Sequence, residues 1–271
     1  MQSLKRYEAS QNFVNETLLR KQKCKRIVVK IGSSLFHSDK DKLDANLING
    51  LISQIAKLIE EEREIVVVSS GAIALGMSTL KLKERPRELS SLQAAAAIGQ
   101  HELMGVYRKA LKAESLNCAQ LLLTWDDFSN HTRYLNAKHT IDTLLKLKCV
   151  PIINENDTVA TEEIKFGDND RLSALVSILV GADSLIILSD VDGLMDRRKK
   201  VIKVVDKITP AIKSLACPTN KKACVGGMIT KIEAARISVE AGIPCIIANG
   251  RKKNIIRTAV NDPLECGTIF L

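Results

Sequence analysis

Short apolar runs rich in valine and isoleucine recur along the chain from residue 26 onward. They lack the alternation of apolar and polar positions that marks a half-exposed strand, so the sheet they form should be buried on both faces. The pattern predicts strands at residues 26–31, 65–69, 119–124, 150–154, 185–189 and 244–248.

Amphipathic stretches with helical period separate these runs, at residues 43–61, 90–112, 132–147 and 228–241. Strand alternating with helix predicts right-handed βαβ units and an α/β fold with a mainly parallel sheet. Residues 1–25 are polar, with a short helix predicted at 15–23, and we interpret them as an N-terminal extension without chemistry. Residues 26–271 contain no internal repeat and no linker rich in proline, glycine or serine, so we expect one domain there.

Composition narrows the class of protein. The chain has 271 residues, of which 45% are hydrophobic, which suffices for a well-buried core. Its apolar runs are shorter than the ~20 residues of a membrane span, and the N-terminus lacks the apolar core of a signal peptide. We therefore expect a cytoplasmic protein without a membrane partner. The seven cysteines are odd in number and form no C-x-x-C pair, which favours reduced thiols over disulfides or a zinc site.

The formal net charge of +9 is compatible with binding to nucleic acid or to small anions. Aromatic residues make up only 3% of the chain and no RNA-binding signature is present, so we predict no nucleic-acid partner. Basic residues gather at 21–26, 197–203 and 251–253, where they either lie in solvated loops and helix ends or attract anionic substrates.

In parallel sheets ligands bind beyond the carboxyl ends of the strands, which directs attention to the residues after each strand. Lys30, Gly32 and Ser33 lie at the end of the first predicted strand, in the series Lys-Ile-Gly-Ser-Ser. This series suits a phosphate group, because glycine permits close backbone approach while hydroxyl and N–H groups donate hydrogen bonds.

The second predicted strand is followed by Ser70, Gly71 and a helix that opens with small residues. A helix N-terminus presents free N–H groups to an anion, although close packing of helix on strand accounts for the same residues. The spacing from Gly71 to Gly76 resembles a P-loop, but Met77 occupies the position of the obligatory lysine, and no G-x-G-x-x-G series is present. Neither a Walker A motif nor the usual dinucleotide-binding fold is therefore predicted.

Two polar clusters, residues 154–157 and 167–171, follow the fourth predicted strand. Buried carboxylates and amides need partners, so these clusters bind a zwitterion such as an amino acid, organise lysines or a metal ion, or form capped polar turns. Further along, Ser189 and Asp190 follow the fifth strand.

A second glycine-to-lysine element begins at Gly226, Gly227 and Met228 and carries Lys231 in the first turns of a helix. Lys30 and Lys231 come from distant parts of the chain. Two such lysines are able to converge on one triphosphate and offset its negative charge.

Taken in order, these motifs resemble the amino acid kinase family over residues 26–271. Within it, the block from Asn154 to Ala174 is most similar to members that phosphorylate the side-chain carboxylate of L-glutamate. The resemblance implies a three-layer α/β/α sandwich with a mainly parallel central sheet, ATP and Mg²⁺ as cofactors, and a role in proline biosynthesis. It also implies a homodimer or homotetramer, with proline as a feedback inhibitor. Members often carry a C-terminal PUA domain, which we expect this chain to lack.

By the same resemblance, Lys30 and Lys231 contact the transferring phosphoryl group, and Asp170 holds both lysines in place. The expected glutamate-binding residues are Ser70, Gly71, Asp157 and Asn169. The expected nucleotide-binding residues are Lys30, Gly32, Ser33, Ser189, Asp190, Gly226, Gly227, Met228 and Lys231. We assign no residue as a metal ligand.

Two stretches depart from the family pattern, and both concern the nucleotide. Cys224 and Val225 stand where the family more often has Gly-Thr, and residues 194–197 lack the usual Tyr-Thr-x-Asp-Pro. One alternative is another enzyme of this fold, acting on acetylglutamate, aspartate, carbamate or a nucleoside monophosphate. A second is a sensor that binds glutamate or proline without turning over ATP, against which the presence of both lysines and Asp170 argues. A third, nucleic-acid binding, is suggested by the net charge alone.

Overall fold

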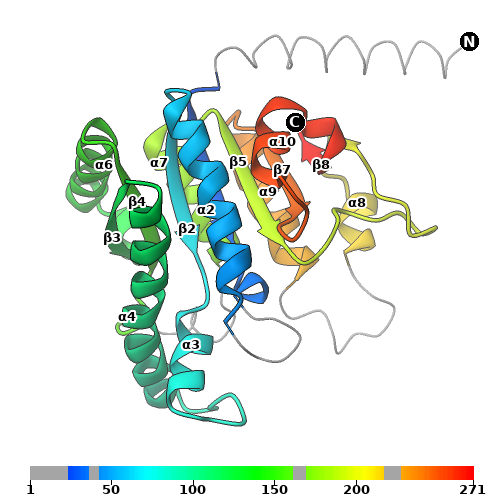
Figure 1. Cartoon of the computed structure of the whole chain (residues 1–271). Coiled ribbons are helices and arrows are strands. Elements are labelled where there is room, and N and C mark those ends of the chain that lie inside the picture. Colours follow the sequence, from blue (N-terminus) through cyan, green and yellow to red (C-terminus); the bar gives the residue numbers. More distant parts are fainter. Residues whose placement is uncertain (1–23, 37–42, 161–168, 217–226) are drawn as a thin grey trace, which may run out of the picture.

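The computed structural model describes residues 24–36, 43–160, 169–216 and 227–271. Within these ranges eight strands form one sheet in the order β3-β4-β2-β1-β5-β7-β8-β6 (Figure 1). The strands are β1 Arg26–Ile31, β2 Glu64–Ser69, β3 Asn117–Leu123, β4 Cys149–Glu155, β5 Ser184–Ser189, β6 Val204–Val205, β7 Cys245–Asn249 and β8 Gly267–Phe270. β1 lies near the centre and pairs in parallel with both β2 and β5.

The predicted parallel sheet is confirmed. Each of the six predicted strands is present, with ends shifted by at most two residues. β6 and β8 were not predicted, because they are only two and four residues long and stand outside the strand–helix alternation. β8 pairs antiparallel with β7, so the sheet is mixed at this edge.

The helices are α2 Ala45–Glu60, α3 Ala72–Thr79, α4 Leu89–Ala113, α5 Trp125–Ser129, α6 His131–Lys146, α7 Asn169–Val180, α8 Pro210–Leu215, α9 Met228–Glu240 and α10 Ile255–Asn261. The four predicted amphipathic helices correspond to α2, α4, α6 and α9, and the helix predicted after Ser70 and Gly71 is α3. The helix predicted at 15–23 lies outside the described residues. In the described part of the chain, none of the helices combines the length and the apolar character that crossing a bilayer requires.

Helices cover both faces of the sheet. Because successive residues of a strand point to opposite faces, neighbouring residues of β1 pack against different helix layers. Ile27 and Val29 of β1 pack in one buried cluster with side chains of α2, α4 and α10. Val28, between them, packs in a second cluster with side chains of α6, α7 and α9. The predicted three-layer α/β/α arrangement is therefore confirmed, and both layers hold β1 rigidly beneath the residues that follow it.

α3 and the adjoining end of α4 extend past the sheet and pack closely together (Figure 1). A Cβ atom on Gly99 of α4 would lie 1.7 Å from the carbonyl oxygen of Ala72. One on Gly76 of α3 would lie 1.8 Å from that of Ala95. These glycines are therefore required for the contact, which fixes α3 directly behind the turn at Ser70 and Gly71.

We expect Gly99→Ala to lower the free energy of unfolding by about 1–3 kcal/mol, because the added methyl group forces the two helices apart. Gly105→Ala is the matched control, since it lies in the same helix with no atom within 4 Å of the added Cβ. That control should be neutral or stabilising by up to ~1 kcal/mol, because alanine is the better helix former. Urea unfolding of both variants measures the difference, and equal stability would contradict the close contact.

Candidate active site

The carboxyl ends of β1, β2, β4 and β5 meet at one edge of the sheet, as parallel pairing requires. The residues that follow these strands are therefore neighbours in space although they are far apart in sequence. The α7 and α9 helices contact each other, and the first turns of both carry predicted site residues.

Lys30, Asp170 and Lys231 come together at this edge. The Nζ atom of Lys30 lies 2.6 Å from Oδ1 of Asp170, and the Nζ atom of Lys231 lies 3.1 Å from Oδ2 of the same carboxylate. The three residues are 5%, 3% and 7% exposed. One carboxylate thus bridges two ammonium groups from a strand and a distant helix.

The charges of this buried cluster do not cancel. Burial alone would raise the pKa of Asp170, but the ammonium groups of Lys30 and Lys231 outweigh it and hold that pKa below its usual range. Asp170 is therefore ionised, and two ammonium groups face a single carboxylate. The remaining positive charge, held where water is scarce, suits an anion.

The opening turn of α9 supports the same cluster. The hydroxyl of Thr230 donates to Oδ2 of Asp170 at 2.8 Å and lies 3.0 Å from the carbonyl oxygen of Gly227. The ammonium group of Lys231 also donates to that carbonyl, at 3.4 Å. Gly227 has a φ of 92°, a left-handed value that favours glycine, so the turn aims its carbonyl at Lys231.

Gly32 brings the end of β1 against the end of β5. Its N–H donates to the carbonyl oxygen of Leu188 at 3.1 Å. A Cβ on Gly32 would lie 3.0 Å from that oxygen and 3.8 Å from both Nζ of Lys30 and Cα of Ser189. The hydroxyl of Ser189 donates to Oδ1 of Asp190 at 2.9 Å. The predicted nucleotide residues after β1 and β5 are thus side by side.

Three further residues were predicted to bind the nucleotide: Ser33, Met228 and Gly226. Ser33 is exposed and begins a 3₁₀ turn after Gly32. Met228 is the first residue of α9 and packs partly buried against the second core cluster, so its side chain serves the core. Gly226 lies outside the described residues, as do Cys224 and Val225.

On the other side of Lys30, Asn169 connects α7 to the end of β2. Its Nδ2 atom donates to the carbonyl oxygen of Ser69 at 2.8 Å, and lies 3.2 Å from the hydroxyl of Ser70 and 2.7 Å from Oδ1 of Asn154. Gly71 follows with a left-handed φ of 109° and opens α3. Ser70 and Asn169, two of the residues predicted to bind glutamate, are therefore in contact.

Asp157 lies in the turn after β4, which Gln93 of α4 holds by donating to the carbonyl oxygen of Ala160 at 3.0 Å. Its side chain is partly buried. Burial raises the pKa of Asp157 to about 6, and the nearby charge of Arg85 offsets only part of that effect. This carboxylate therefore changes charge near neutral pH.

The predicted residue set omitted three partners of the site. Thr230 is adjacent to Lys231, and a hydroxyl side chain at a turn predicted to bind phosphate was a usable signal. Asn154 belongs to a predicted polar cluster but was given no individual role. Gln100 lies within a predicted amphipathic helix, where nothing in the local sequence marks it as a partner of the site.

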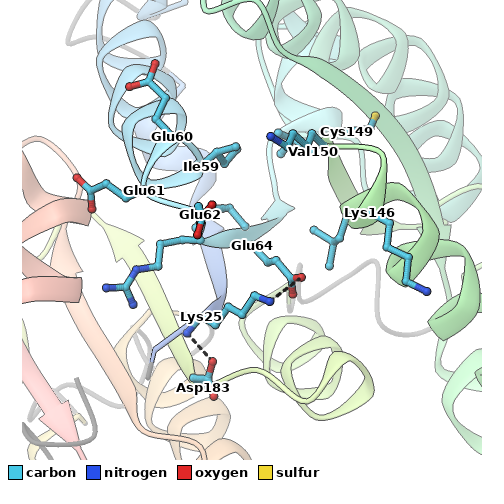
Figure 2. Close-up of a pocket in the computed structure, with 14 residues that line it drawn as sticks. Lys25, Ile59, Glu60, Glu61, Glu62, Glu64, Lys146, Cys149, Val150 and Asp183 are labelled. Carbon is cyan, nitrogen blue, oxygen red and sulfur yellow. Dashed lines mark hydrogen bonds and ion pairs between the residues drawn. The ribbon is translucent and has the colours of Figure 1, made fainter. Parts of the chain in front are cut away.

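A cavity of about 1060 Å³ lies at the opposite, amino-terminal edge of the sheet (Figure 2). Asp183 there accepts hydrogen bonds from the N–H groups of Lys25 and Arg26 at 2.7 and 2.8 Å. The carboxylate of Glu64 pairs with Arg26 at 2.7 Å. Because these acidic groups already have protein partners and lie away from Lys30, we assign the cavity no part in the chemistry.

Comparison with curated proteins gives relatives of high similarity. A glutamate 5-kinase of Caldanaerobacter subterraneus subsp. tengcongensis is 46% identical over 253 residues, covering 91% of this chain and 68% of the relative. A glutamate 5-kinase of Marinomonas sp. is 47% identical over 240 residues, covering 86% of this chain and 64% of the relative. The chain thus spans about two thirds of the length of these relatives.

Among solved structures, N-acetylglutamate synthase from Neisseria gonorrhoeae, complexed with coenzyme A and L-arginine, superposes with a TM-score of 0.65. The match covers 94% of this chain and 64% of that one at 13% identity, so it supports the fold alone. The amino acid kinase family itself matches residues 25–249, a range that contains Lys30, Asp170 and Lys231. On this match and on the identity to the curated relatives, the chain belongs to the amino acid kinase family.

Proposed function

We propose that this chain is a glutamate 5-kinase, which transfers the γ-phosphate of ATP to the γ-carboxylate of L-glutamate and gives γ-glutamyl phosphate and ADP. This is the first step of proline biosynthesis. Curated glutamate 5-kinases that are 46% identical over 91% of the chain support the assignment. The observation that carries it is the buried Lys30–Asp170–Lys231 cluster, whose spare positive charge suits a transferring phosphoryl group.

The reaction needs no general base. An oxygen of the γ-carboxylate, with a pKa of ~4.3, is ionised at neutral pH and attacks the γ-phosphorus directly. The bond from that phosphorus to the β-phosphate oxygen breaks, and its electron pair leaves with ADP. The obstacle is repulsion between two anions. Lys30 and Lys231 offset it, and Asp170 positions both ammonium groups without taking a proton.

ATP is the phosphoryl donor of this proposal, bound by the residues after β1 and β5 and by the start of α9. These are Lys30, Gly32, Ser33, Ser189, Asp190, Gly226, Gly227, Met228 and Lys231. The described residues contain no group of three or more His, Cys, Asp or Glu side chains that could hold a metal ion. By the family resemblance, ATP is bound together with Mg²⁺. Such an ion would neutralise part of the phosphate charge.

Glutamate is the acceptor, bound by Ser70, Gly71, Asp157 and Asn169 beside Lys30. Feedback inhibition by proline, assembly into a homodimer or homotetramer, and a cytoplasmic location belong to the same proposal and rest on the family resemblance. The division into an extension at 1–25 and a kinase domain at 26–271 stays a prediction.

The test is production of γ-glutamyl phosphate by the purified chain, trapped as the hydroxamate with hydroxylamine in the presence of Mg-ATP. We expect hydroxamate and ADP to form together and only when L-glutamate is added. Aspartate and N-acetylglutamate, the acceptors of rival enzymes of this fold, should give no product above background. Glutamate binding by calorimetry without any turnover would instead favour the sensor alternative and refute the kinase proposal.

The raised pKa of Asp157 predicts pH-dependent glutamate binding. Above about pH 6 its carboxylate is ionised and attracts the ammonium group of glutamate, whereas below that pH it is neutral. The KM for glutamate should therefore rise as pH falls from 7.5 to about 5.5, by up to ~4-fold, because the ionised fraction of a group with a pKa of about 6 falls by that factor over this range. Measuring the KM for ATP in the same series separates this effect from titration of ATP.

Asp157→Asn is the control for this pH effect, because it lacks the titrating group. Its KM for glutamate should be high and independent of pH over the same range. An Asp whose pKa is raised in the folded state stabilises the fold at low pH and loses that contribution as pH rises through about 6. Asp157→Asn should therefore raise the melting temperature of the ligand-free protein at pH 7.5. A pH dependence that survives this substitution would rule Asp157 out.

A further inference from the structure

A continuous series of side-chain amides leads from α4 to the proposed glutamate site. The Nδ2 atom of Asn154 donates to Oε1 of Gln100 at 2.8 Å, and Nδ2 of Asn169 lies 2.7 Å from Oδ1 of Asn154. Asn154 and Asn169 are only 2% and 7% exposed. A buried amide cannot replace its protein partners with water, so it matters whether its oxygen or its NH₂ group faces each neighbour.

Two backbone groups fix that direction. The carbonyl oxygen of Ser69 only accepts, so the atom of Asn169 that lies 2.8 Å from it must be the NH₂ group. The N–H of Glu155 only donates, so its partner at 2.9 Å must be the carbonyl oxygen of Asn154. Asn154 is then left with its NH₂ group toward Gln100, and the amide of Gln100 must present its oxygen.

The series leaves one unused group at each end. Oδ1 of Asn169 is buried and has no hydrogen-bond partner among the described residues, and the same is true of Nε2 of Gln100. A buried acceptor without a partner costs free energy, so it is expected where a ligand supplies the donor. Oδ1 of Asn169 belongs to the residue that contacts Ser70, at the proposed glutamate site.

We propose that Gln100 is a positioning residue for glutamate: through Asn154, it holds Asn169 with Oδ1 turned toward the bound substrate and ready to accept from its ammonium group. The inference rests on the proposed function and deepens it. It assigns the amide of Asn169 to a positively charged hydrogen-bond donor and explains how a side chain of α4 contributes to a site that it does not touch.

Gln100→Glu and Gln100→Met separate the two ends of the Gln100 amide. Gln100→Glu keeps an oxygen acceptor for Asn154, replaces the NH₂ group, which has no partner among the described residues, and adds a negative charge. Methionine has a similar length and helix propensity but offers no comparable acceptor, so Asn154 loses its partner. The measurements are KM for glutamate, KM for ATP and kcat in the hydroxamate assay, together with melting temperatures of both variants.

We expect Gln100→Met to raise KM for glutamate about tenfold while KM for ATP stays unchanged, because one orienting hydrogen bond is lost. Gln100→Glu should retain a KM for glutamate close to that of the unaltered chain. If Gln100→Met does not fold, Gln100→Ala replaces it, and calorimetric titration with glutamate gives the same comparison without turnover.

Three results would overturn the inference: an unchanged KM for glutamate in Gln100→Met, an equal rise of KM for both substrates, or equal impairment of Gln100→Glu and Gln100→Met. The second would indicate a general structural role, and the third a role for the NH₂ group. Failure of the proposed function is recognised separately, because the unaltered chain would then form no glutamate-dependent hydroxamate.

Discussion

Asp170→Asn should lower kcat by about 10²–10³ while the chain keeps its fold. The substitution preserves the size of the side chain but removes the carboxylate that forms ion pairs with both Lys30 and Lys231. The two ammonium groups then repel each other in a buried setting, so one moves away or loses its proton. Anion binding survives in part, whereas the geometry that stabilises the transferring phosphoryl group is lost. Turnover from hydroxamate formation and KM for ATP measure the two effects separately.

Asp142→Asn is a matched control for this prediction. Asp142 also lies between two cations, with Arg26 at 2.8 Å and Lys138 at 3.8 Å. Asp142 lies in α6 and pairs with Arg26 at the start of β1, whereas Lys30 lies near the other end of that strand. The control should therefore leave kcat close to that of the unaltered chain. Near-normal turnover of Asp170→Asn, or an equal loss in both variants, would contradict the assigned role of Asp170.

The sequence allowed the strands to be predicted because their physical environment is extreme. A strand buried on both faces is apolar except where it carries a functional group. In Arg26–Ile31 the four apolar residues are fully buried, and the one buried polar residue is Lys30 of the candidate site. β6 and β8 carry no such signal, since Val204–Val205 is too short and the order of strands at the β7 edge depends on tertiary pairing. Local sequence does not contain that information.

The same distinction applies to the candidate site. Lys30 was predicted from its position at the end of a strand, and Lys231 from the glycines before it. The sharing of one carboxylate between them depends on the contact of α7 with α9, which no local pattern specifies. Gln100 illustrates the limit, because its partner Asn154 lies 54 positions away and only the fold brings them together. The family resemblance identified Asp170, whereas its physical reason required the structure.

The second large effect is expected for the lysines themselves, where Lys30→Met and Lys231→Met should each lower kcat by about 10²–10³. Methionine keeps much of the apolar volume of the lysine side chain, so the loss reflects the missing ammonium group. Lys138→Met is the control, since Lys138 pairs with Asp142 at the other edge of the sheet and should retain normal kcat.

The double variant Lys30→Met, Lys231→Met tests whether the two lysines act together. If both stabilise the same phosphoryl group through positions set by Asp170, either single substitution already disrupts the arrangement. The double variant should then lose much less than the product of the two single losses, as is usual for groups that act as a unit. Multiplying losses would instead mean that each lysine contributes independently. Asp170 would then serve chiefly as a buried counter-charge that keeps both side chains in the fold, and the bridging distances of 2.6 and 3.1 Å would matter for stability more than for transfer.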